Sequence, residues 1–128
     1  MANEPIKILV VEDIKIALKM ALIILQELGC EVHTAASGIQ SLDLVRAHHY
    51  DVIFMDLGLP DIDGLTLTET IRKLNDSELE RDKTLIVALT AHGYSLKEDC
   101  IQAGMDDFIE KPLTIEASTR IFERHGLI

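Results

Sequence analysis

Three carboxylates lie directly after two apolar runs of the chain. Glu12 and Asp13 follow the run 6–11, and Asp56 follows the run 51–55. If both runs are strands of one parallel sheet, these carboxylates meet at one edge, where like charges are tolerated only after protonation or beside a cation. Oxygen ligands suit Mg²⁺ or Mn²⁺, and Mg²⁺ keeps waters that phosphoryl oxygens can replace. The cluster is therefore suited to phosphoryl chemistry.

Polar groups also follow two other apolar runs. Lys111 follows the run 106–110 and adds a compact positive charge. Thr90 and Ala91 follow the run 84–89 and offer a hydroxyl donor and a backbone N–H that a phosphate oxygen can approach. Adjacent acidic residues or a single lysine are common on solvated surfaces. Their shared position after strand-like runs is what favours a site.

The apolar pattern alternates between short strand-like runs and longer helical stretches. The predicted strands cover residues 6–11, 31–35, 51–55, 84–89 and 106–110. The first, third and fourth are almost continuously apolar, which is typical of central strands covered on both faces. Repeated strand–helix units predict an α/β fold, a five-stranded parallel doubly wound sheet with five helices. Ligands bind such sheets beyond the carboxyl ends of the strands, where the polar groups above are expected.

Several residues mark the predicted helix ends. Ser37-Gly-Ile-Gln40 and Ser95-Leu-Lys-Glu98 match the capping box, in which two side chains satisfy free backbone N–H groups at a helix start. Gly29 and Gly104 follow helical stretches, where glycine closes a helix in the left-handed conformation. The last helix should begin near Thr114.

Composition excludes several classes of protein. The chain has 128 residues, 48% of them hydrophobic, which predicts a single domain spanning residues 1–128. Its 22 acidic and 12 basic residues give a formal charge of −10, so direct nucleic-acid binding is not expected. We expect no membrane insertion, because we find no apolar run of the ~20 residues needed. Cys30 and Cys100 form no C-x-x-C pair and favour free thiols in the cytoplasm.

Taken together, these segments resemble the receiver domain of two-component response regulators. The matching segments are residues 10–13, 56–64, 90–91 and 104–112. The resemblance covers essentially the whole chain, and the combination is specific where each segment alone is weak. Segment 56–64, with Gly-Leu-Pro at its centre, is most similar to receivers of hybrid sensor histidine kinases. The family implies a flavodoxin-like sheet with strand order 2-1-3-4-5.

The resemblance implies a role for each residue of the cluster. Asp56 would be the phosphoacceptor, attacking a phosphohistidine of a partner. Glu12, Asp13, Asp56 and the backbone carbonyl of Gly58 would hold Mg²⁺. Lys111 would pair with the carboxylate and then with the phosphoryl oxygens.

The resemblance also implies a switch. Thr90 would donate its hydroxyl to the phosphoryl group and move toward it, and Phe108 would turn inward into the vacated space. Phe108 occupies a position where family members often have tyrosine. The other interpretation of Phe108 is a residue that only packs in the core. The Lys111-Pro112 bond is cis in the family. His92 and Ala91 follow Thr90 and are expected to modulate the phosphorylated site. We expect His92 to affect the lifetime of the phosphate; the other interpretation is a solvated histidine in a loop.

The first predicted helix, residues 14–28, carries a second apolar stripe. Its core-facing stripe comprises Ala17, Leu18, Ala21, Leu22, Leu25 and Leu28. Ile16, Met20 and Ile23 fall roughly opposite, and we interpret them as a docking patch for the helix that carries the donor histidine. That partner would be a histidine kinase or a histidine phosphotransfer protein. Scattered surface residues and a weak homodimer contact are the other interpretations.

Three other functions stay open from the sequence. A degenerate receiver would act only as a scaffold. A flavodoxin-like cofactor module would need Gly, Ser or Thr in place of Glu12 and Asp13, which repel a phosphate without a metal. An aspartate-nucleophile phosphatase would carry Asp-x-Asp after the first strand. As a receiver, the chain would catalyse only its own phosphorylation and dephosphorylation. It would be a stand-alone receiver, a shuttle in a phosphorelay or a part of a hybrid histidine kinase.

Overall fold

The computed structural model describes residues 4–74, 83–91 and 95–128. Its strands are β1 (Lys7–Val11), β2 (Glu31–Ala35), β3 (Val52–Asp56), β4 (Leu85–Thr90) and β5 (Asp107–Glu110). Its helices are α1 (Lys15–Glu27), α2 (Gly38–Ala47), α3 (Gly64–Leu74), α4 (Lys97–Ala103) and α5 (Ile115–Arg124). The strands form one parallel sheet in the order β2-β1-β3-β4-β5, which confirms the predicted fold.

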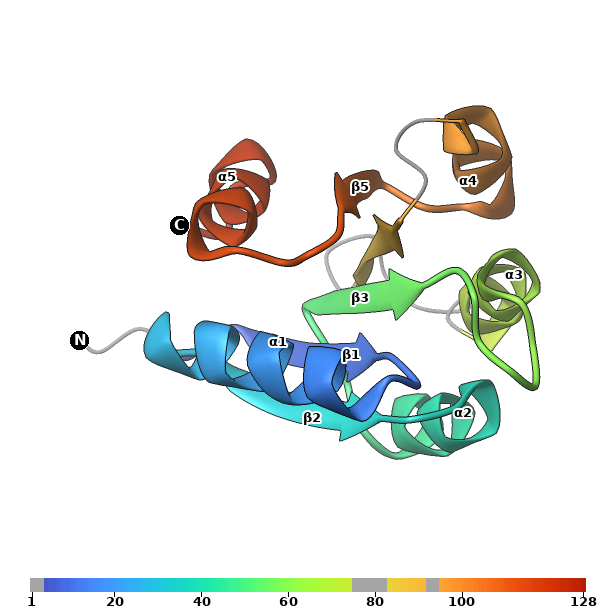
Figure 1. Cartoon of the computed structure of the whole chain (residues 1–128), viewed down its shortest axis with the longest axis horizontal. Coiled ribbons are helices and arrows are strands. Elements are labelled where there is room, and N and C mark those ends of the chain that lie inside the picture. Colours follow the sequence, from blue (N-terminus) through green and yellow to red (C-terminus); the bar gives the residue numbers. More distant parts are fainter. Residues whose placement is uncertain (1–3, 75–82, 92–94) are drawn as a thin grey trace.

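The sheet is covered on both faces. Helices α1 and α5 lie on one face, and α2, α3 and α4 lie on the other (Figure 1). Within β1, Ile8 and Val10 belong to the core under α1 and α5, whereas Leu9 and Val11 belong to the opposite core. Both sets are fully buried, so β1 must be apolar from Ile8 to Val11, whereas Lys7 at its start is exposed.

The register of the central strands aligns their carboxyl ends. Val11 of β1 pairs with Met55 of β3, and Asp56 pairs with Leu89 of β4. The residues that follow these strands therefore leave the sheet side by side. This edge is where the sequence predicts the polar cluster.

Most predicted helix boundaries are confirmed. Gly29 and Gly104 have positive φ angles of 83° and 107°. Ser37 caps α2 and Thr114 caps α5. The predicted capping box at Ser95 is wrong, because α4 begins at Lys97. Its N-cap residue is Leu96, whose side chain makes no capping hydrogen bond.

Three further expectations concern the described residues. Cys30 and Cys100 are buried free thiols. In the part of the chain that the structure describes, no helix has both the length and the apolar character to cross a bilayer. The Lys111-Pro112 bond is cis, as the resemblance implies.

Candidate functional site

Three carboxylates converge at the carboxyl edge of the sheet. Glu12 and Asp13 leave the end of β1, and Asp56 is the last residue of β3. One carboxylate oxygen from each residue lies within 4.8 Å of the other two. Glu12 is 2% exposed and Asp56 is 6% exposed, whereas Asp13 is half-buried. This all-oxygen set, open on one side, fits a hard divalent cation that keeps some of its waters.

Lys111 supplies positive charge to the same cluster. Its Nζ lies 2.7 Å from Glu12 Oε1 and 3.1 Å from Asp56 Oδ1. The backbone N–H of Lys111 donates to the Thr90 carbonyl oxygen at 2.8 Å. The loop after β5 is thereby joined to the end of β4, which aims the lysine toward Asp56.

Burial and hydrogen bonding together move the pKa values of Glu12 and Asp56 in opposite directions. Burial raises the pKa of Glu12 above its ordinary value, although the hydrogen bond with Lys111 acts in the opposite direction. Burial also acts to raise the pKa of Asp56, but hydrogen bonds with Glu12, the Gly58 amide and Lys111 outweigh it and lower the pKa. For Lys111, burial lowers the pKa, and hydrogen bonds to both carboxylates reverse that effect and raise it. The ionised form of Asp56 is thus favoured, as a nucleophile requires.

A cavity of about 360 Å³ opens beside these side chains. Its lining includes Asp13, Asp56, Gly58, Thr90, Ala91 and Lys111. Thr90 is buried and ends β4, so it faces the same space as the carboxylates. The structure brings together the residues that sequence analysis assigned to one site, with His92 outside the described residues.

The loop 57–63 returns the chain from β3 to α3 and includes Gly58. The Gly58 amide donates to Asp56 Oδ1 at 3.1 Å, and Asp63 Oδ1 accepts from Leu65 and Thr66 amides at 3.0 Å, which caps α3. A Cβ on Gly64 would lie 2.8 Å from the backbone oxygen of Asp56. Gly64 has no role assigned from the sequence, where its place at the end of segment 56–64 is the only indication that this position matters.

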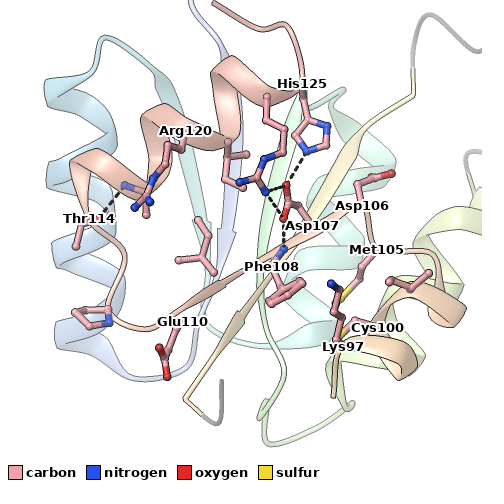
Figure 2. A pocket seen from close by; sticks show the side chains of 16 residues that line it. Lys97, Cys100, Met105, Asp106, Asp107, Phe108, Glu110, Thr114, Arg120 and His125 are labelled. Atoms are coloured by element: carbon pink, nitrogen blue, oxygen red, sulfur yellow. Dashed lines mark hydrogen bonds and ion pairs between the residues drawn. The ribbon is translucent and has the colours of Figure 1, made fainter. Parts of the chain in front are cut away.

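Phe108 lies away from the carboxylate cavity. It lines a groove of about 830 Å³ between α4, β5 and α5, where Figure 2 shows its ring close to Lys97. The Lys97 ammonium is 5.5 Å from the ring centroid. On the wall of the groove, Asp107 accepts from Arg124 at 2.8 Å and from His125 at 2.9 Å (Figure 2). Phe108 is half-buried and lines this groove.

The second apolar stripe of α1 is exposed. The side chains of Ile16, Met20 and Ile23 are 71%, 54% and 49% exposed. On the opposite side of the helix, Ala21 and Leu25 are buried in the core. Ile16 lies three residues after Asp13, so the stripe begins beside the carboxylate cluster.

Comparison with known proteins gives one consistent family. The sequence matches the response regulator receiver domain family over residues 8–123. It is 36% identical over 126 residues to hybrid signal transduction histidine kinase L of Dictyostelium discoideum, covering 94% of this chain. The chain spans only 7% of the length of that kinase.

Two solved structures have the same fold. The receiver domain of sensor histidine kinase PA1611 from Pseudomonas aeruginosa PAO1, with magnesium in its active-site cleft, has a TM-score of 0.80 and 35% identity, covering 94% of this chain and 97% of its own. The receiver domain of Ssk1 from Saccharomyces cerevisiae, crystallised with the histidine phosphotransfer protein Ypd1, has a TM-score of 0.83 and 25% identity. It covers 96% of this chain and 90% of its own.

Proposed function

This chain belongs to the response regulator receiver domain family of two-component systems, and on that premise we propose that Asp56 accepts a phosphoryl group from a partner phosphohistidine. One observation carries the proposal: three carboxylates lie within 4.8 Å of one another, and the Lys111 ammonium lies 3.1 Å from Asp56. A purely structural acidic cluster gains nothing from placing Asp56, whose ionised form is favoured, beside an open cavity. A site for phosphoryl transfer requires it.

We propose that the cluster holds Mg²⁺ or Mn²⁺ through Asp13, Asp56, the Gly58 carbonyl and Glu12. The magnesium in the PA1611 receiver supports this assignment. When bound, the cation neutralises charge on the carboxylates and on the phosphoryl oxygens. Glu12 also holds Lys111 in place, since its carboxylate lies 2.7 Å from the ammonium.

In the reaction, an Asp56 carboxylate oxygen forms a bond to phosphorus as the phosphorus–nitrogen bond of the phosphohistidine breaks. The electron pair of that bond returns to the imidazole nitrogen of the partner. Lys111 stays beside the product and pairs with the oxygens of the new aspartyl phosphate. Thr90 and Ala91 line the cavity, and we propose that the Thr90 hydroxyl and the Ala91 amide donate to the same oxygens.

We propose that the signal leaves the site through Thr90 and Phe108. The phosphoryl group favours the Thr90 position that donates to it, and the space that Thr90 leaves favours an inward Phe108 ring. Phe108 lines the groove between α4 and α5, and we propose that this is its position before phosphorylation. A scaffold without phosphorylation is not favoured, because the acidic cluster and its lysine are intact.

The test is transfer from a phosphorylated histidine phosphotransfer protein to this chain, with labelled phosphate followed on both proteins. We expect label to leave the donor and appear on this chain in Mg²⁺, and no transfer in excess chelator. Loss of label from the donor as free phosphate, without labelled receiver at early times, would contradict the proposal.

We further propose that Ile16, Met20 and Ile23 dock the helix that presents the donor histidine. They form an exposed apolar row on α1 that begins beside the acidic cluster. Exposed apolar side chains in a row are typical of partner surfaces. The cytoplasm, where histidine kinases act on their receivers, is the location that we propose for this encounter.

Replacing Met20 by glutamate should slow transfer from the partner about tenfold, because a charge would enter the apolar contact. Transfer kinetics measure the effect, with Met20→Leu as a matched variant that should keep the wild-type rate. Phosphorylation of Met20→Glu by a small phosphodonor should be unchanged, since that donor needs no docking surface. Equal rates of partner transfer for Met20→Glu and wild type would contradict the patch.

A further inference from the structure

The loop 57–63 is joined to a second helix by a side chain that the reaction does not use. Asp61 Oδ1 accepts from the Gly38 amide at 2.9 Å, and Asp61 Oδ2 accepts from the Ile39 amide at 2.9 Å. These amides belong to the first two residues of α2, which have no partner within their own helix. Asp61 therefore joins the middle of the loop to the N-terminus of α2.

The contact between this loop and α2 is close. A Cβ on Gly38 would lie 3.2 Å from Ile62 Cβ and 3.3 Å from Asp61 Oδ1. The glycine thus lets the loop approach near enough for both hydrogen bonds. The position does not have a positive φ angle, so alanine there is opposed by contact with the loop and not by the backbone.

The other attachments of the loop are the burial of Leu59 in the core and hydrogen bonds at the ends of the loop. Gly58 donates to Asp56 Oδ1 at the start of the loop, and Asp63 caps α3 at its end. Between these two points, Asp61 gives the backbone of the loop a hydrogen-bonded support from outside the β3–α3 unit. Gly58 lies three residues before Asp61 and is exposed, so the orientation of its carbonyl depends on how firmly this segment is held.

We propose that Asp61 is a positioning residue, which fixes the loop 57–63 against α2 and so keeps the Gly58 carbonyl oriented toward the divalent cation. This inference rests on the proposed function, because it concerns the same metal site. Side chains that orient metal ligands commonly change metal affinity without touching the metal. Consistent with a firm contact, the amides of Ile39 and Gly38 hold the pKa of Asp61 below its ordinary value.

The test is calorimetric titration of the unphosphorylated protein with MgCl₂. Asp61→Ala removes both acceptors and should raise the Kd for Mg²⁺ about tenfold. Asp61→Asn keeps one acceptor oxygen but places an NH₂ group against the other backbone N–H, so it should weaken Mg²⁺ binding, and by less than Asp61→Ala does. Gly38→Ala should weaken binding as Asp61→Ala does, although alanine favours the helix.

A second readout separates positioning from general destabilisation. The rate of phosphorylation by a small phosphodonor, plotted against Mg²⁺ concentration, should shift to higher concentration in Asp61→Ala and reach the wild-type maximum. A Kd for Asp61→Ala equal to that of wild type would overturn the inference and leave the proposed function intact. A wild type that binds no Mg²⁺ would instead contradict the proposed metal site itself.

Discussion

Asp56→Asn should take up no phosphoryl group under conditions that phosphorylate the wild type. The amide is isosteric with the carboxylate, and its oxygen can still accept from the Gly58 amide and from Lys111, which lie 3.1 Å from Asp56 Oδ1. It has no anionic oxygen to attack phosphorus, so we expect the rate to fall at least about 1,000-fold. Intact mass after incubation with a small phosphodonor and Mg²⁺ measures the adduct.

Asp63→Asn is the matched control for this variant. Asp63 lies in the loop that follows Asp56 and caps α3, and asparagine is an equally good N-cap residue. We expect this control to be phosphorylated like the wild type. An adduct on Asp56→Asn as large as that on Asp63→Asn would show that another side chain is the acceptor.

Lys111→Met should destabilise the metal-free protein by about 3 kcal/mol at pH 7, because two buried carboxylates lose their counter-charge. Breaking a buried ion pair typically costs about 3–5 kcal/mol, and we expect the lower value because the Lys111 side chain is 23% exposed. Urea unfolding measures the loss. Lys19→Met, the same change on the exposed face of α1, should cost less than about 0.5 kcal/mol.

Two conditions should reduce the deficit of Lys111→Met. Burial raises the pKa of Glu12, and loss of the Lys111 hydrogen bond, which acts to lower that pKa, raises it further in the variant, so the variant gains more stability than the wild type as the pH falls. The deficit should therefore shrink from pH 7 to pH 5. Saturating Mg²⁺ should also reduce it, because the cation replaces the missing positive charge. A deficit that is independent of both pH and Mg²⁺ would mean that Lys111 acts through packing alone.

The sheet could be predicted from the sequence because its local signals are strong. The strands β1, β3 and β4 are buried on both faces, so their apolar runs are continuous and their ends fall within one residue of the predicted ones. In a parallel sheet, the ends of these strands must lie at one edge. The convergence of Glu12, Asp56 and Lys111 follows from that rule, without any knowledge of side-chain geometry.

Other features depend on contacts between distant segments, which no local pattern contains. The Ser95 pattern predicted a helix cap, but the helix begins beyond it, at Lys97. Asp61 is an ordinary loop aspartate in the sequence, and only the fold brings it to Gly38, 23 residues away. The groove that holds Phe108 likewise requires α4 and α5 to be placed on either side of β5.

The dependence of phosphorylation on a divalent cation tests the central claim most directly. Wild-type protein is incubated with a small phosphodonor, in Mg²⁺ or in excess chelator, and its intact mass is measured over time. The carboxylate cluster predicts the gain of one phosphoryl group in Mg²⁺ and none in chelator. Equal gain in both conditions, or no gain in Mg²⁺, would contradict a metal-assisted phosphoacceptor site at the edge of this sheet.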